Sequence, residues 1–305
     1  MSQMVNGREA NGQALNLVIG GSGLVGGYIV EHLANRGGPV LAMSRSPRKG
    51  RVEWIQGDLR QPDALNLPQF TTLYCTTDAI LLAEALPFIL GPSVKRVVVF
   101  SSTSVLTKRD TEIADERETI RKLVTAEEAI AAACERHQIA WTILRPTLIY
   151  AEGRDTNITP LSRLIRRFGF MPIVGGARGF RQPVHAEDLA IAAIAAAERT
   201  IAANKFYSLP GPETLTYREM MGRVFDGMGL PRRLIYVPPW LWRAGFRLAK
   251  PLFPGANVAM GIRMMKDMTF DCRPAVQDLG WQPRDFHPAF DSVSPQQNGQ
   301  VARHP

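Results

Sequence analysis

Apolar residues in the first half of the chain form short blocks with two different periodicities. Some blocks are continuous runs of β-branched and aliphatic residues, such as Arg96–Phe100, which is typical of buried strands. Others repeat apolar residues every three or four positions and end just before glycines, as in 24–35, which is typical of helices. The blocks predict strands at 14–19, 40–43, 52–55, 72–75, 96–100 and 140–144, and helices at 24–35, 79–90, 116–137 and 188–199.

Strands and helices therefore alternate from residue 15 to residue 150. Parallel strands need crossover connections, which are usually helices, so this order predicts an α/β fold with a doubly wound parallel sheet of the Rossmann type. After residue 150 glycine and proline become frequent and the pattern becomes irregular, which favours a second, smaller mixed α+β substrate domain. The expected organisation is a flexible N-terminus at 1–14, the Rossmann domain at 15–204 with substrate loops at 151–182, the smaller domain at 205–291 and a disordered tail at 292–305.

Composition narrows the classes of partner. The chain has 36 Lys and Arg against 28 Asp and Glu, a net charge of +8, which raises the question of nucleic acid. The basic residues are scattered, however, without a helix-turn-helix or a basic and aromatic stripe, so we expect no nucleic-acid partner. The three cysteines are far apart and form no Cys-x-x-Cys motif, so we expect neither disulfides nor a metal site. We see no signal peptide and no run of eighteen apolar residues, and we expect a cytoplasmic protein.

A glycine-rich turn joins the first predicted strand to the first predicted helix, with the spacing Gly-x-x-Gly-x-x-Gly. Glycines at such a turn let the backbone approach a pyrophosphate, and the helix start offers unpaired N–H groups and a favourable dipole. The turn therefore predicts dinucleotide binding, with a glycine-rich turn that holds no ligand as the alternative. The expected contacts are Gly20, Gly21, Ser22, Gly23, Leu24, Val25 and Gly26.

This spacing resembles the short-chain dehydrogenase/reductase superfamily, and further segments sharpen the resemblance to its NAD-dependent epimerase/dehydratase branch. Those segments are Gly57-Asp58-Leu59, Phe100–Val105, Leu144–Tyr150 and Gln182–Asp188, and they follow the family's order over roughly residues 15–200. Residues 205–290 resemble the family's variable substrate domain only loosely. The resemblance implies a small-molecule substrate and, in many members, a homodimer.

The end of the second predicted strand indicates which cofactor would bind. An acidic residue there would bind the ribose of NAD, but the strand ends Ser44-Arg45 and has no carboxylate. A guanidinium can hold a 2′-phosphate through two hydrogen bonds, which gives a preference of about 10- to 100-fold for NADP over NAD. The alternative is a solvated basic loop. The resemblance adds Asp58 and Leu59 near the adenine, Thr76 and Thr77 near the ribose, and Pro146.

The resemblance also implies catalysis by a serine or threonine, a tyrosine, and a lysine four residues after the tyrosine, where the lysine lowers the tyrosine's pKa. We expect Thr103 to supply the hydroxyl group. None of the six tyrosines has a lysine four residues later. Lys122 is the candidate for the lysine, with Glu118 one helical turn before it, and a surface ion pair between the two is the alternative.

The second domain holds two candidate substrate contacts that the resemblance implies, Asn157 and Arg181. The aromatic and basic segment 238–253 favours an apolar pocket or a subunit contact over a lipid surface. Together the features predict an NADP(H)-dependent oxidoreductase or epimerase/dehydratase-like enzyme for a small carbonyl or sugar-nucleotide-like substrate. Because the tyrosine is missing, the alternative is a non-catalytic NADP(H)-binding protein, either a redox sensor or a structural subunit.

Overall fold

The computed structural model describes residues 14–107, 113–242, 261 and 263–290. The chain forms two compact units that interleave along the sequence. The first comprises Met1–Ile149, Gln182–Glu213 and Met268–Asp285, and the second comprises Tyr150–Arg181, Thr214–Asp267 and Phe286–Pro305. The sequence led us to expect one boundary near residue 204, whereas the chain passes between the units several times.

A seven-stranded sheet forms the centre of the first unit, in the order β11-β6-β5-β4-β1-β2-β3, and all neighbouring strands are parallel. The six strands predicted from the sequence are confirmed, and their ends differ from the predicted ends by about two residues or fewer. The seventh strand, β11, lies in a stretch that we had assigned to the smaller domain. The strands are β1 Asn16–Ile19, β2 Val40–Ser44, β3 Glu53–Gln56, β4 Thr72–Cys75, β5 Arg96–Phe100, β6 Ala140–Pro146 and β11 Lys205–Leu209.

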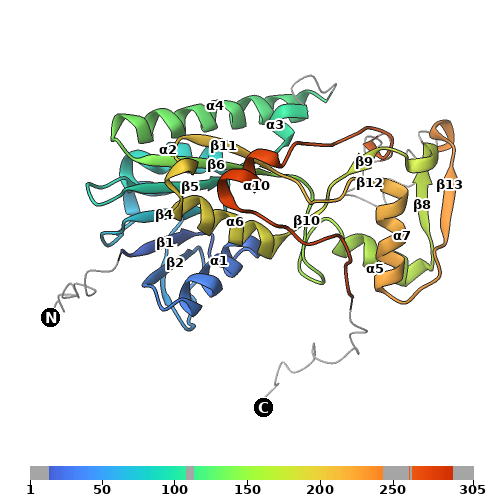
Figure 1. The fold of residues 1–305 in the computed structure, drawn as a ribbon, viewed down its shortest axis with the longest axis horizontal. Coiled ribbons are helices and arrows are strands. Elements are labelled where there is room, and N and C mark those ends of the chain that lie inside the picture. The colour runs from blue at the N-terminus through green and yellow to red at the C-terminus, as the bar shows by residue number, and fades with distance from the viewer. Residues whose placement is uncertain (1–13, 108–112, 243–260, 262, 291–305) are drawn as a thin grey trace, which may run out of the picture. The chain divides into compact units, whose positions relative to one another are not determined.

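Helices cover both faces of this sheet (Figure 1). Helices α1 (Leu24–Asn35) and α6 (Ala186–Glu198) pack together on one face, and α2 (Ala79–Ile89) and α4 (Ala114–Arg136) pack together on the other. A sheet that is buried on both faces needs apolar residues throughout, which explains the continuous runs in its strands. The first unit also contains the shorter elements α3 (Ser104–Thr107), β10 (Val184–His185) and α10 (Arg273–Leu279).

The strand order reverses beside β1, which lies between β2 and β4. Ile19, the last residue of β1, is in register with Met43 on β2 and with Cys75 on β4. In open α/β sheets, ligands bind outside the carboxyl ends of the strands at such a reversal, because the connecting segments diverge there. The topology therefore places a binding crevice where the glycine-rich turn follows β1.

The second unit is a mixture of helices and two-stranded ribbons, as the sequence predicted. Its strand pairs are β8 with β13, which are parallel, and β9 with β12, which are antiparallel. The short strand β7 (Ile149–Tyr150) begins the segment that enters this unit. Its helices and strands in the described residues include α5 Thr159–Phe168, β8 Met171–Val174, β9 Phe180–Arg181, β12 Leu215–Thr216, α7 Tyr217–Gly227 and β13 Leu234–Val237.

Three stretches singled out from the sequence fall largely outside the described residues: the N-terminus at 1–14, the aromatic and basic segment from 243 onward, and the tail at 292–305. At the described start of the aromatic segment, the Trp240 side chain is largely exposed. None of the helices in the described part of the chain is long and apolar enough to cross a membrane.

Candidate functional site

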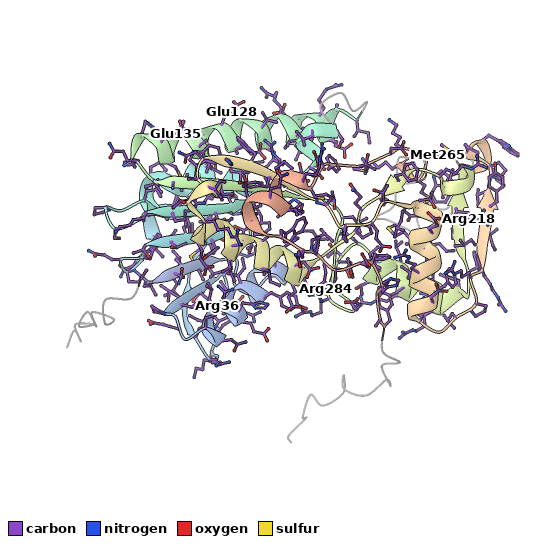
Figure 2. All side chains as sticks on the ribbon, in the orientation of Figure 1. Arg36, Glu128, Glu135, Arg218, Met265 and Arg284 are labelled. Atoms are coloured by element: carbon purple, nitrogen blue, oxygen red, sulfur yellow. The ribbon has the colours of Figure 1, made fainter. Side chains whose placement is uncertain are left out.

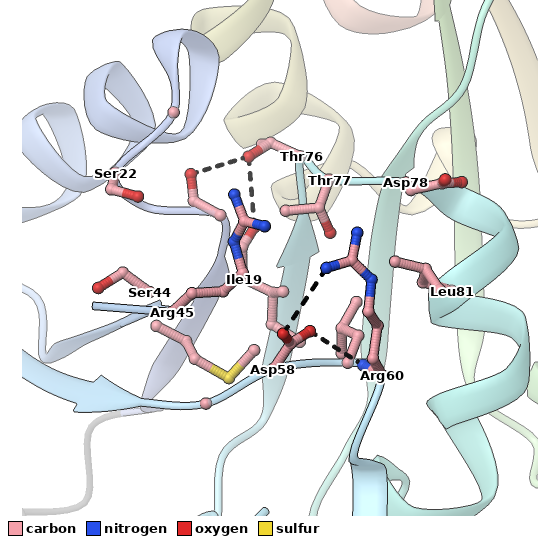
Figure 3. A pocket seen from close by; sticks show the side chains of 15 residues that line it. Ile19, Ser22, Ser44, Arg45, Asp58, Arg60, Thr76, Thr77, Asp78 and Leu81 are labelled. Carbon is pink, nitrogen blue, oxygen red and sulfur yellow. Dashed lines mark hydrogen bonds and ion pairs between the residues drawn. The ribbon is translucent and has the colours of Figure 1, made fainter. Parts of the chain in front are cut away.

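A cavity of about 320 Å³ opens at the carboxyl ends of β1, β2 and β4, where the strand order reverses (Figure 3). Nine of the residues predicted to bind the cofactor line it, together with Ile19, Met43, Gly57, Arg60, Asp78 and Leu81. The nine are Gly20, Ser22, Gly23, Ser44, Arg45, Asp58, Leu59, Thr76 and Thr77.

The glycine-rich turn has two positions that only glycine can occupy without rearrangement. Gly20 has a φ of +81°, in the left-handed region, and its carbonyl accepts the N–H of Gly23 at 2.8 Å. A Cβ atom on Gly26 would lie 2.2 Å from the Gly20 carbonyl oxygen and 2.7 Å from the Thr76 hydroxyl oxygen. The sequence of the turn is thus dictated by a close approach of backbone to backbone.

No side chain caps the start of helix α1. Its N-cap is Gly23, which makes no side-chain hydrogen bond, whereas Asp78 caps α2 and Thr216 caps α7. The first N–H groups of α1 therefore remain available to an anion, and the helix dipole favours negative charge at that end. The turn fits the pyrophosphate of a dinucleotide, since it combines a bare helix start with a backbone that side chains do not cover.

Thr76 fixes the end of β4 against the turn. Its hydroxyl donates to the carbonyls of Ile19 at 3.3 Å and Gly20 at 3.2 Å, and its N–H donates to Ile19 at 3.0 Å. Thr77 beside it is exposed, with its hydroxyl 3.4 Å from the Cys75 sulfur. Thr76 therefore shapes the turn, and Thr77 presents its side chain towards the cavity.

Two arginines line the cavity from the segments that follow β2 and β3 (Figure 3). Arg45 follows β2 directly, is exposed, and has no hydrogen-bond or ion-pair partner for its guanidinium among the described residues. Nearby Arg48, by contrast, lies 5.6 Å from the centre of the Trp54 ring. Arg60 is the second cation; its Nη1 lies 4.0 Å from Asp58 Oδ2, and its backbone N–H donates to Asp58 Oδ1 at 3.0 Å. Sequence reasoning missed Arg60, although it directly follows the Gly57-Asp58-Leu59 segment.

The other predicted cofactor residues do not line this cavity. Gly21, Val25 and Gly26 are buried behind the turn, and Leu24 is half-buried at the start of α1. Pro146 ends β6, and its carbonyl is occupied by hydrogen bonds from Thr103.

The two residues predicted for catalysis make contacts within the protein. Thr103 is buried, and both its hydroxyl and its N–H donate to the Pro146 carbonyl, at 3.0 and 3.1 Å. The side chain of Lys122 is 60% exposed, and its Nζ lies 3.7 Å from Glu118. Arg121 pairs with the same carboxylate more closely, at 2.8 Å, and its hydrogen bonds lower the pKa of Glu118. This arrangement is the surface ion pair that the sequence left open as the alternative.

Three tyrosines are poor proton donors at neutral pH because their pKa values are raised. Burial raises the pKa of Tyr217 to about 12, and it also raises the pKa values of Tyr74 and Tyr207. Tyr150 is buried, and its ring packs edge-on against Phe286, with 4.9 Å between ring centres. The expected tyrosine and lysine relay therefore has no counterpart among these four residues.

The two candidate substrate residues lie in the second unit. Arg181 is buried, and its guanidinium donates to the carbonyls of Phe180 at 2.6 Å, Lys266 at 2.7 Å and Arg263. Burial lowers the pKa of Arg181, and the guanidinium lies 5.7 Å from the centre of the Tyr217 ring. The backbone N–H of Asn157 donates to Asp155 at 2.7 Å. Arg181 thus ties the chain around residues 263–266 to β9.

Comparisons with known proteins agree with this geometry. Residues 16–86 match the model of the NAD dependent epimerase/dehydratase family. The mitochondrial NADH dehydrogenase [ubiquinone] 1 alpha subcomplex subunit 9 of Arabidopsis thaliana is 27% identical over 250 residues, which cover 72% of this chain and 59% of the plant protein. The chain thus matches less than two thirds of that relative's length.

Solved structures share the fold at lower identity. MoeE5 in complex with UDP-glucuronic acid and NAD superimposes with a TM-score of 0.67 at 20% identity, over 88% of this chain and 94% of that one. The epimerase Mth375 from Methanothermobacter thermautotrophicus superimposes with a TM-score of 0.68 at 15% identity, over 91% of this chain and 90% of that one. Both comparisons confirm the Rossmann-like fold predicted from the strand and helix pattern.

Proposed function

We propose that the first unit, whose residues 16–86 match the model of the NAD dependent epimerase/dehydratase family, binds a nicotinamide dinucleotide and prefers NADP(H) to NAD(H). The observation that carries the preference is the free guanidinium of Arg45 at the end of β2. An acidic residue at that place would select the ribose hydroxyls of NAD, whereas an arginine is suited to a 2′-phosphate.

The residues around the cavity support one orientation of the ligand. The pyrophosphate would lie on the turn from Gly20 to Gly26, where the start of α1 is uncapped. The adenosine phosphate would then lie between Arg45 and Arg60, which both line the cavity. The adenine would lie near Asp58, as the family resemblance implies.

The test is a titration of the cofactor-free protein with NADPH and with NADH. We expect NADPH to bind at least about tenfold more tightly, and we expect Arg45→Ala to remove that preference while leaving NADH binding unchanged. Arg48→Ala is the matched control, since Arg48 lies on the same loop but contacts Trp54. Equal affinity for the two cofactors in the wild type would refute the preference, and no binding of either would refute the proposed function.

For the chemical role, we propose hydride transfer to a small carbonyl or sugar-nucleotide-like substrate, with a proton donor other than the family's tyrosine. The sugar-nucleotide class is supported by the fold shared with MoeE5, whose structure contains UDP-glucuronic acid and NAD. Deuterium-labelled NADPH incubated with a panel of carbonyl compounds and sugar nucleotides tests this role. If Thr103→Ala and Lys122→Ala both kept full activity, those two residues would have no catalytic part.

A second candidate role is a cofactor-binding subunit of a larger assembly, without turnover. Two observations favour it: the plant relative is named as a subunit of an NADH dehydrogenase, and both Thr103 and Lys122 are engaged in contacts within the protein. This role predicts tight NADPH binding and no transfer of deuterium to any compound in the panel. Transfer to a single metabolite would exclude it.

A further inference from the structure

A second cavity lies wholly within the second unit and is separate from the dinucleotide site. It has a volume of about 640 Å³ and is lined by residues of the β8–β9 connection, β12, the first two turns of α7, and the start of β13. Ligand pockets for small molecules typically measure about 300–1,000 Å³, so a ligand of nucleotide size fits within it.

Three arginines line this cavity, and only one of them is neutralised. Arg232 forms a two-pronged ion pair with Asp226, with Nε at 2.8 Å from one carboxylate oxygen. Arg178 and Arg218 are exposed, and neither has a hydrogen-bond or ion-pair partner among the described residues. Figure 2 labels Arg218 on α7.

The acid in the cavity wall is already engaged. The Glu219 carboxylate accepts the N–H and the hydroxyl of Thr216, at 2.8 and 2.7 Å, and these hydrogen bonds complete the capping box of α7. These bonds do not cancel its charge, but it forms no ion pair with Arg178 or Arg218 in the described part of the chain. With two unpaired arginines and one carboxylate in the wall, the cavity keeps an excess of positive charge.

The apolar part of the wall is as distinctive as the charge. Phe180, which is 40% exposed, lines the cavity from β9, and Leu234 lines it from β13. Successive residues of a strand point to opposite faces, so Phe180 and Arg181 face opposite sides of β9. This agrees with the burial of Arg181, whose guanidinium is bound to backbone carbonyls. The cavity thus does not use Arg181, the residue that the family resemblance had suggested for substrate.

We propose that this cavity binds a phosphorylated ligand of nucleotide size, with its phosphates on Arg178 and Arg218 and its ring on Phe180. Guanidinium groups bind phosphate through paired, charge-assisted hydrogen bonds, and an exposed aromatic face stacks on a planar ring. Arg232 lies against Gly222 of α7, where a Cβ atom would be 3.1 Å from its guanidinium, and it closes that side of the cavity. This site is independent of the proposed function of the first unit.

The test is calorimetric titration of the full chain with ADP, read as a number of binding sites. The dinucleotide site also fits ADP, so we expect two sites in the wild type. Replacing both free arginines, Arg178→Gln with Arg218→Gln, is expected to weaken one site at least tenfold and leave the other unchanged. The control is Arg166→Gln, which removes an exposed arginine of the same unit that does not line the cavity.

The outcomes separate this proposal from the first one. If the wild type bound ADP at a single site and the double variant lost that site, the result would support the second-unit cavity and refute nucleotide binding in the first unit. Unchanged ADP binding in the double variant, or an equal loss in Arg166→Gln, would overturn the proposal. Phe180→Ala tests the ring contact: it should weaken ADP and leave inorganic pyrophosphate unaffected, and equal effects on both would refute that contact. Thermal unfolding of each variant checks that it is folded.

Discussion

Glu127 of α4 and Arg145 of β6 form a buried, two-pronged ion pair. Arg145 donates from Nε at 2.9 Å and from Nη2 at 2.5 Å, and the Glu127 side chain is only 2% exposed. The same guanidinium lies 4.3 Å from the centre of the Phe206 ring on β11. Arg145 belongs to one of the segments that carry the family resemblance, and its contacts join one helix and two strands. At least part of that resemblance therefore reflects the needs of the fold.

Removing the acid from this pair should destabilise the first unit strongly. Glu127→Ala leaves a guanidinium without its partner in a site that water scarcely reaches, and breaking a buried pair in this way costs about 3–5 kcal/mol. Urea unfolding measures the loss. Glu118→Ala on the same helix is the control, because its carboxylate is exposed and its ion pairs are screened by solvent. Equal losses in the two variants would show that the buried pair contributes no more than the exposed one.

The glycine-rich turn allows a comparison between adjacent positions of one helix. An alanine at Gly26 would place its Cβ atom 2.2 Å from the Gly20 carbonyl oxygen, whereas at Gly27 the nearest such atom is at 3.7 Å. We expect Gly26→Ala to displace the turn and weaken NADPH at least tenfold. Gly27→Ala should keep the affinity and stabilise α1 by about 1 kcal/mol, since alanine is the better helix former. NADPH titration and thermal unfolding of both variants provide the measurements, and similar affinities would contradict the steric argument.

Much of the first unit could be predicted from local sequence, for a physical reason. Strands buried on both faces must be continuously apolar, so β4 and β5 stand out with their observed ends. Helix α1 also begins and ends where its periodicity and glycines indicate. The glycine-rich turn was identifiable because its residues are constrained by the backbone immediately around them. In each case the information lies within a few residues of the element itself.

Features that depend on distant partners were not predictable in this way. Strand β11 has a half-exposed pattern, and it joins the sheet only because β6 offers a free edge. Arg60 is a candidate for cofactor binding only because the turn after β3 brings it to the cavity. The engagement of Thr103 with Pro146 joins residues 43 positions apart, which no local pattern encodes. The cavity in the second unit is of the same kind, because its lining residues come from two stretches of the chain, 176–180 and 216–234.

The cysteines should differ sharply in reactivity. Burial raises the pKa of the Cys134 thiol to about 12, and it also raises the pKa of Cys75, which is fully buried. Cys272 is only partly buried. Because the thiolate is the reactive form, a disulfide reagent at pH 8 should label one thiol of the folded protein quickly and all three after denaturation. The variant Cys272→Ser should abolish the fast phase. Rapid labelling of three thiols in the native protein would contradict the burial of Cys75 and Cys134.

Asp155 organises the start of α5 in the second unit. It is buried, and its carboxylate accepts the N–H groups of Asn157 at 2.7 Å, Ile158 at 2.5 Å and Thr159 at 3.2 Å, and the Thr159 hydroxyl at 2.6 Å. Burial alone would raise the pKa of Asp155, but these hydrogen bonds outweigh it and hold the pKa below its usual value of 3.8. The carboxylate takes up several of the N–H groups that every helix start leaves unpaired.

A lowered pKa in the folded state means that Asp155 stabilises the protein above pH 3.8 and that this contribution is lost as the pH falls through its folded pKa. Asp155→Ala should therefore cost about 2 kcal/mol at pH 7, where the charged acceptor and its hydrogen bonds are removed. The difference between wild type and variant should shrink steadily as the pH falls below 3.8, because protonation of the wild-type carboxyl removes the charge that its hydrogen bonds stabilise. Urea unfolding at a series of pH values measures it, with the exposed Asp63→Ala as the control. A difference that stays constant down to pH 2 would show that Asp155 acts through its shape and not through its charge.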